Sequence, residues 1–131
     1  KYLPVFYHST NKAYIVPISG KGLWSTLFGF LALNEDKNTV KGITFYKHKE
    51  TPGLGGEVDK AWFQDNFIGK KIFNSKNELV SIQVPKGAAS ALSKDKQIHA
   101  VDGITGATMT SKGLSDFLLR DLNRYEEFLR R

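Results

Sequence analysis

The sequence predicts an α+β fold, in which a single domain packs an antiparallel β-sheet against helices, including a C-terminal amphipathic helix. Two apolar runs around a polar turn indicate a β-hairpin. A helical period near the end of the chain indicates an amphipathic helix. A length of 131 residues suits one domain with one hydrophobic core.

The hairpin is expected where residues 24–33 and 39–46 flank the polar residues 34–38. Apolar and polar side chains are interspersed in the second run, as in a strand with one buried face. Gly42 lies within that run and is expected to mark a β-bulge.

Two shorter strands are expected outside the hairpin. Residues 13–18 read as a strand that Pro17 and Gly20 end. Residues 79–84 alternate between apolar and polar side chains, which predicts a second short strand.

Helices are expected in two places. Asp59 is a candidate N-cap for a short helix that runs to about Phe67 and ends at Gly69. A longer helix is expected from about Ser111, with Thr110 or Ser111 as its N-cap. Its apolar positions follow a period of 3.6 residues: Leu114, Phe117, Leu118, Leu122, Tyr125, Phe128 and Leu129.

Composition narrows the functional classes. The net charge of +6 comes from 19 basic and 13 acidic residues, but the lysines are scattered and form no stripe interleaved with aromatic side chains. Nucleic-acid binding is therefore not expected. The chain has no cysteine, and its three histidines are far apart, so no metal site is expected. No apolar run reaches the roughly 18 residues of a membrane span.

Two glycine-rich segments are candidates for chemistry. Residues 102–110 precede the long helix, and small side chains there leave room for a ligand beside amides that favour an anion such as phosphate. The hydroxyl of Thr108 offers a place for a phosphoester. Residues 50–56 form a rigid Pro-Gly turn suited to lining a flat ligand. Each segment taken alone also fits a plain turn or connector.

Together the two segments resemble a known family, the FMN-binding domain of the C subunit of the sodium-translocating NADH:quinone reductase. The sister family is the G subunit of the Rnf electron-transport complex. The resemblance covers nearly the whole chain, 1–131, as a single FMN-binding domain. Its motifs are Gly-Lys-Gly-Leu-Trp at 20–24, Glu-Thr-Pro-Gly-Leu-Gly at 50–55, His-Ala-Val-Asp at 99–102 and Thr-Gly-Ala-Thr-Met-Thr-Ser at 105–111. The first motif favours the sodium-pump family.

The resemblance implies that a flavin transferase attaches FMN through a phosphoester to Thr108, with Thr110 as a disfavoured rival. It implies that Asp102 matters for recognition or turn geometry, and that Thr105, Gly106 and Ala107 complete the attachment motif. It places several residues near the flavin ring: Glu50, Thr51, Leu54, Gly55 and Trp24. The hydroxyl of Thr108 is a tether, and no residue of the domain is expected to be catalytic.

The resemblance also implies a setting. The domain is expected to relay electrons as an oxidoreductase subunit of a membrane complex that transports sodium, with the other subunits as its partners. A membrane anchor, absent from this sequence, is expected before the domain. The domain itself is expected on the periplasmic face of the bacterial inner membrane. Three alternatives stay open: an Rnf-type subunit with the same covalent FMN, a non-catalytic scaffold whose glycines only make turns, and an anion- or nucleic-acid-binding module.

Overall fold

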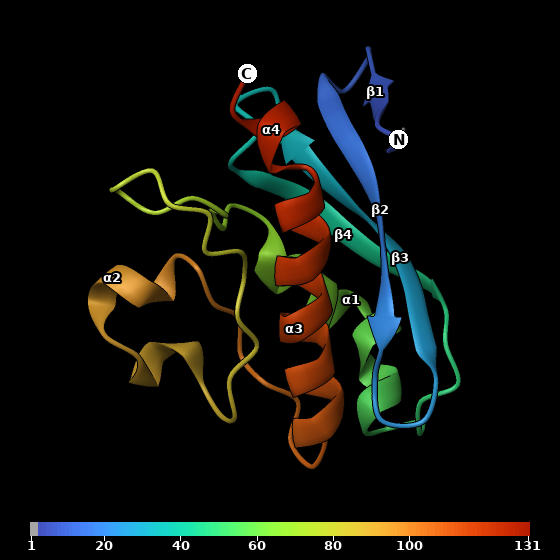
Figure 1. Ribbon diagram of the computed structural model, residues 1–131. Helices are drawn as coiled ribbons and strands as arrows, with labels where there is room; N and C mark the ends of the chain where they lie inside the picture. The colour runs from blue at the N-terminus through green and yellow to red at the C-terminus, as the bar shows by residue number, and fades with distance from the viewer. Residues whose placement is uncertain (1–2) are drawn as a thin grey trace.

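A four-stranded antiparallel sheet forms the centre of the computed structural model, which describes residues 3–131. The strands follow one another in chain order (Figure 1), and their bounds are β1 Phe6–His8, β2 Ala13–Lys21, β3 Thr26–Asn34 and β4 Val40–Lys47. The predicted α+β class with an antiparallel sheet is confirmed. Strand β1 is short and had no counterpart in the prediction.

The predicted hairpin is β3 and β4, and its bulge lies beside Gly42. Ala32 pairs with Gly42 and Leu33 pairs with Val40, so Lys41 is the extra residue of β4. Trp24 does not belong to the strand, contrary to the prediction, because β3 begins only at Thr26.

The strand predicted over residues 13–18 is longer than expected, since β2 continues through Pro17 and Gly20 to Lys21. Proline is tolerated because β1 pairs only with Ala13–Ile15. The outer edge of β2 is therefore free at Pro17, where a missing N–H costs no ladder bond. Gly20 lies within the strand. Glycine is required there because a Cβ would lie 2.2 Å from Cβ of Phe117.

Between β4 and the C-terminal region the chain makes only short helical turns. These are η1 Gly55–Asp59, α1 Ala61–Gln64, η2 Asp65–Phe67, η3 Ala89–Ala91 and α2 Lys94–Gln97. The prediction of one helix capped by Asp59 was wrong, because Asp59 ends η1 and Lys60 precedes α1. Gly69, with a φ of +87°, does follow the last of the first three turns as predicted.

The strand predicted over residues 79–84 does not form. The amides of Val80 and Ser81 both donate to the carbonyl of Ile72, as at a β-bulge, so no regular ladder continues through this segment. Ser81 has a φ of +61°, which breaks the extended backbone. Only isolated bridges occur here, at Leu79 and Gln83.

The C-terminal helix is confirmed, but it begins earlier than predicted. Helix α3 spans Thr108–Arg124 with Ala107 as its N-cap, and α4 spans Glu126–Leu129. Of the seven apolar positions predicted, all but Phe128 are buried. Thr108 is thus the first residue of the helix rather than part of the loop before it.

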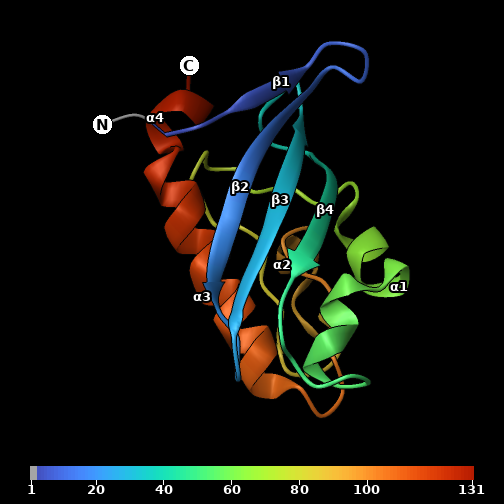
Figure 2. The same ribbon diagram turned by 90° about the vertical axis from the view of Figure 1, so that its right-hand side faces the viewer.

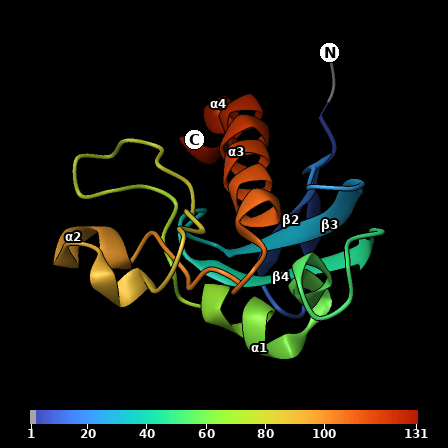
Figure 3. The same cartoon turned by 90° about the horizontal axis from the view of Figure 1, so that it is seen from below.

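Helix α3 lies between the sheet and the irregular segment 70–106 (Figures 1 and 3). Its apolar side chains pack on the buried face of the sheet, where the rings of Phe117 and Phe45 meet edge to face at 6.5 Å. Asp121 of α3 accepts a hydrogen bond of 2.9 Å from the amide of Ser19 in β2. Figure 2 shows the sheet and α3 running side by side, so the N-terminus of α3 reaches the β2–β3 turn.

Candidate functional site

A tight turn delivers the chain into helix α3. The amide of Ala107 donates to the carbonyl of Ile104 at 3.0 Å, and Gly106 has a φ of +76°. This positive φ at the third position is that of a type II turn, which favours glycine. The turn leaves the side chains of Thr105 and Thr108 exposed to solvent.

The start of α3 has no cap of its own. The N-cap residue is Ala107, whose methyl side chain cannot accept a hydrogen bond. The first turn of the helix contains no acidic residue. Within residues 3–131, the amides of Thr108, Met109 and Thr110 have no hydrogen-bond acceptor. Free amides at a helix N-terminus favour an anion as their acceptor.

Asp102 holds the loop that precedes this turn. Its Oδ1 accepts a hydrogen bond of 2.8 Å from the amide of Ala89, and the amide of Gly103 donates to the carbonyl of Gly87 at 2.8 Å. Both bonds join residues 102–103 to segment 85–89. Asp102 thus holds the loop before the turn in place, and its expected part in recognition or turn geometry stays a prediction.

Glu50 joins three parts of the site. Its carboxylate accepts hydrogen bonds from the amide of Leu23 (2.7 Å), the amide of Trp24 (3.0 Å), the hydroxyl of Ser25 (2.7 Å) and the hydroxyl of Thr110 (2.8 Å). Burial raises the pKa of Glu50, but these donors outweigh burial and hold the pKa below its usual value. A buried carboxylate thus clamps the β2–β3 turn onto the first turn of α3.

The second glycine-rich segment lies against the same helix. The carbonyl of Thr51 accepts hydrogen bonds from the amides of Leu54 (3.0 Å) and Gly56 (2.9 Å), which closes the loop. Gly55 is buried against the side chain of Thr110. Leu54 reaches to the turn at residues 104–107, since a Cβ on Gly106 would lie 3.0 Å from its Cδ2.

Four exposed apolar residues belong to the segments that meet at the start of α3, and we call them the apolar rim. They are Leu23 (42% exposed), Trp24 (70%), Leu54 (43%) and Met109 (57%). Large apolar side chains gathered on a surface indicate a binding site. The motifs pointed to Trp24 and Leu54 as ring contacts but not to Leu23 or Met109, because an apolar residue is expected in the core by default.

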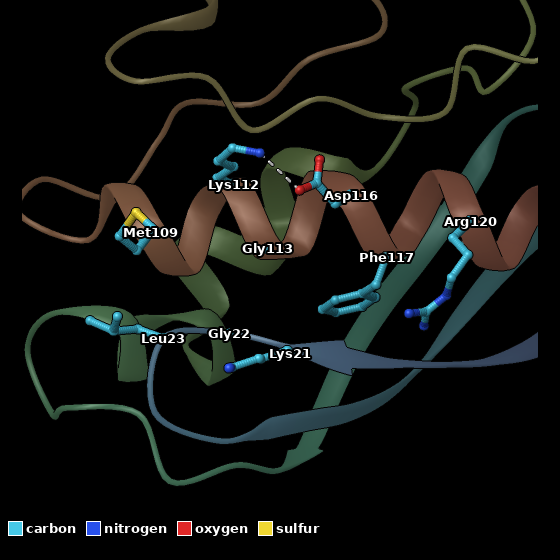
Figure 4. A pocket seen from close by; sticks show the side chains of 9 residues that line it. All are labelled: Lys21, Gly22, Leu23, Met109, Lys112, Gly113, Asp116, Phe117 and Arg120. Carbon is cyan, nitrogen blue, oxygen red and sulfur yellow. Dashed lines mark hydrogen bonds and ion pairs between the residues drawn. The ribbon is translucent and has the colours of Figure 1, made fainter.

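A groove runs from the apolar rim along α3 (Figure 4). Leu23 and Met109 lie at one end and Arg120 at the other, with a volume of about 490 Å³. Its floor is tight, because a Cβ on Gly113 would lie 2.2 Å from the carbonyl oxygen of Lys21. Lys112 forms an ion pair of 3.1 Å with Asp116 on the helix side of the groove.

A smaller hollow of about 230 Å³ includes Thr108 itself. It is lined by the turn at residues 104–107, by Ser111 of α3 and by residues 85–87. Thr108 thus has this hollow beside it, with the groove and the apolar rim next to Met109. Ser111 was predicted only as a possible helix cap, and its place in this hollow had no signal in the sequence.

The structure brings the two predicted segments to one place, at the N-terminus of α3. The residues that carry this are Trp24, Glu50, Leu54, Gly55, Gly106 and Thr110. The carboxylate of Glu50 is occupied by protein donors, so it positions other residues. Contact of FMN with any of the predicted residues stays a prediction.

The family of FMN-binding domains matches residues 22–122 of this sequence. The chain belongs to this family. The match includes both glycine-rich segments and most of α3, the parts of this FMN-binding domain that form the site.

The curated relatives of this FMN-binding domain are the same subunit of one kind of complex, taken from different bacteria. The C subunit of the Na(+)-translocating NADH-quinone reductase of Pseudomonas aeruginosa is 50% identical over 104 residues, which is 79% of this chain and 39% of that protein. The same subunit of Haemophilus ducreyi is 50% identical over 102 residues, which is 78% of this chain and 37% of that protein. The chain therefore spans about two fifths of the length of these relatives.

Two solved structures share the fold of the domain. The C subunit of the same reductase from Parabacteroides distasonis has a TM-score of 0.84 at 40% identity, over 97% of this chain and 61% of that one. NqrC of Shewanella oneidensis has a TM-score of 0.73 at 33% identity, over 90% of this chain and 54% of that one. These likenesses confirm the predicted family and fold.

Two kinds of feature are missing from residues 3–131. No helix there combines the length and apolar character that a bilayer crossing requires. No group of three or more histidine, aspartate or glutamate side chains in the described part of the chain has the arrangement of a metal site.

Proposed function

We propose that this domain carries FMN through a phosphoester on Thr108 and relays electrons within a sodium-translocating NADH:quinone reductase. One observation carries the proposal: the exposed residue Thr108 starts an uncapped helix and lies between a small hollow and the apolar rim. The free amides suit the phosphate, and the rim suits a flat apolar ring. The residues present therefore fit FMN.

The chain supplies a tether and a surface. A flavin transferase would bring FAD: the Thr108 oxygen bonds to the phosphorus of the FMN half, the bond to AMP breaks, and the hydroxyl proton is released with AMP. FMN, once bound, supplies reversible electron transfer. Thr108 is exposed, which gives the transferase access to its hydroxyl.

The residues around Thr108 would hold the ring open to partners. Trp24 and Leu54 offer an aromatic and an aliphatic wall, and Met109 extends that wall along the helix. Glu50 keeps these parts together through its four hydrogen bonds. Since the rim is exposed, an electron donor or acceptor on another subunit can approach the ring.

The names of the relatives support the setting. We infer that the partners are the other subunits of a membrane reductase, because both relatives are subunits of such a complex. An anchor in the bacterial inner membrane and a periplasmic position are part of this proposal. The sodium-pump complex is preferred to the Rnf complex because the relatives at 50% identity are its C subunit.

The attachment is tested by intact mass and peptide mapping after co-expression with a flavin transferase. We expect the wild-type chain to gain the mass of FMN less water on the peptide that contains Thr108. Thr108→Ala removes the gain, and Thr108→Ser keeps it because the hydroxyl stays. Thr44→Ala, a change at an exposed threonine of β4 outside both glycine-rich segments, is the matched control and keeps the gain. A gain that survives Thr108→Ala refutes the attachment.

A further inference from the structure

Ser111 carries a buried hydroxyl with no partner. The residue is 3% exposed, and within the described chain its Oγ neither donates nor accepts a hydrogen bond. A buried polar group left unpaired destabilises the folded state, because it has lost its hydrogen bonds to water. Such a cost calls for a reason, and a ligand that completes the bond is one.

The position of Ser111 relates it to Thr108. The two residues are three apart on α3, so their side chains lie on the same face of the helix, with Cβ atoms roughly 5–6 Å apart. Both line the hollow of about 230 Å³ beside the attachment turn. A phosphorus atom bonded to the Thr108 oxygen would therefore lie within reach of the Ser111 hydroxyl.

The surroundings of this hollow favour a negative charge. The amides of Thr108, Met109 and Thr110 have no acceptor in the described chain, and the first turn of α3 contains no acidic side chain. Lys86 also lines the hollow. A phosphodiester has two free oxygen atoms and one negative charge, which match a hydroxyl donor together with helix amides.

We propose that the Ser111 hydroxyl binds the phosphate of FMN on Thr108, together with the free amides of the first turn of α3. This inference rests on the proposed attachment at Thr108. The hydroxyl is a positioning group: it fixes the direction in which the phosphate leaves the helix, and so where the ring meets the apolar rim. It takes no part in electron transfer.

The test compares four proteins, wild type and Ser111→Ala, each purified with and without FMN. Without FMN, Ser111→Ala leaves the folding equilibrium constant unchanged or raises it, because an unpaired hydroxyl is removed. With FMN, the gain in that constant on flavinylation falls about tenfold in the variant, the worth of one hydrogen bond to a charged group. The phosphorus NMR resonance of the phosphodiester also shifts.

Two further variants serve as a control and as a conservative replacement. Ser81→Ala is the matched control: Ser81 is also buried with an unpartnered hydroxyl in the described chain, but it does not line the hollow. Its gain on flavinylation and its phosphorus resonance stay as in wild type. Ser111→Thr keeps a hydroxyl, so we expect both the gain in the folding constant and the phosphorus resonance to match wild type. This variant also tests the proposal if Ser111→Ala gives too little flavinylated protein.

The outcomes separate the two proposals. FMN on Thr108 of the wild type, with an unchanged gain and resonance in Ser111→Ala, overturns the role of Ser111 and leaves the attachment standing. An absence of FMN from Thr108 in the wild type overturns both. An equal loss in Ser81→Ala also overturns the role of Ser111, because the effect would then follow from any buried serine.

Discussion

Glu50 shows how much of this site depends on a single residue. Its carboxylate is 5% exposed and accepts four hydrogen bonds, from two amides and two hydroxyls. The donors come from the β2–β3 turn and from α3, which are far apart in the sequence. The glutamate that the family motif places near the flavin is therefore a support for the residues that would contact it.

We expect Glu50→Gln to destabilise the domain by about 2 kcal/mol or more, because an amide nitrogen then faces donors that need an acceptor. Chemical denaturation of the FMN-free domain measures this cost. Glu127→Gln is the matched control, since Glu127 is exposed, and we expect it to stay within about 0.5 kcal/mol of wild type. Equal stability of the two variants would show that the carboxylate does not clamp the site.

Trp24 offers a residue-scale test of the apolar rim. The chain has two tryptophans, and both Trp24 and Trp62 are exposed, at 70% and 48%. If the ring lies on the rim, flavinylation quenches the fluorescence of Trp24, because the ring lies beside it. Trp62→Phe isolates Trp24 and should show strong quenching, whereas Trp24→Phe isolates Trp62 and should show less. The reverse order would place the ring elsewhere.

Helix α3 and strand β2 pack closely beside the candidate site. A Cβ on Gly113 would lie 2.2 Å from the carbonyl oxygen of Lys21, and one on Gly20 would meet Phe117. Two glycines, one on each element, thus allow the helix to pack closely against the strand. This close packing places Met109 and Leu23 at the same end of the groove (Figure 4).

We expect Gly113→Ala to destabilise the domain by about 1–2 kcal/mol, because the overpacking cost against a backbone atom exceeds the roughly 1 kcal/mol that alanine gains in helix propensity. Gly42→Ala is the comparison, since nothing lies within 4 Å of a Cβ there. We expect that variant to be neutral or slightly stabilised. Thermal unfolding distinguishes the two, and a stabilised Gly113→Ala would contradict the close approach.

For the whole molecule, the buried carboxylate links acidity to the integrity of the site. Burial raises the pKa of Glu50, but the hydrogen-bond donors outweigh burial and bring the pKa below its ordinary value of 4.5. A lowered folded-state pKa means that the contribution to stability is complete above pH 4.5 and is lost as the pH falls through the folded-state pKa. Protonation therefore loosens the clamp between the β2–β3 turn and α3.

The difference in unfolding free energy between wild type and Glu50→Gln isolates this effect from other acidic groups. We expect the difference to be constant above pH 4.5 and to shrink steadily below it. Denaturation curves of both proteins across this range measure it. A difference that stays constant down to the acid unfolding of the wild type would mean that Glu50 does not titrate with a lowered pKa.

The sequence by itself determined the features that depend on local pattern. The hairpin and its bulge at Gly42 followed from alternation around a polar turn, and the C-terminal helix followed from a 3.6-residue period. The two glycine-rich segments and the family followed from motifs. Each of these is written in residues that are neighbours along the chain, so no knowledge of the rest of the fold was needed.

Only the tertiary structure decided how these parts meet. Residues 79–84 alternate like a strand, yet only isolated bridges form there, at Leu79 and Gln83, because the positive φ of Ser81 breaks the extended backbone between them. The start of α3 at Thr108 and the unpaired hydroxyl of Ser111 also depend on contacts made at a distance. Burial and hydrogen-bond partners are properties of the assembled chain, and so the geometry around Thr108 could not be predicted from its motif alone.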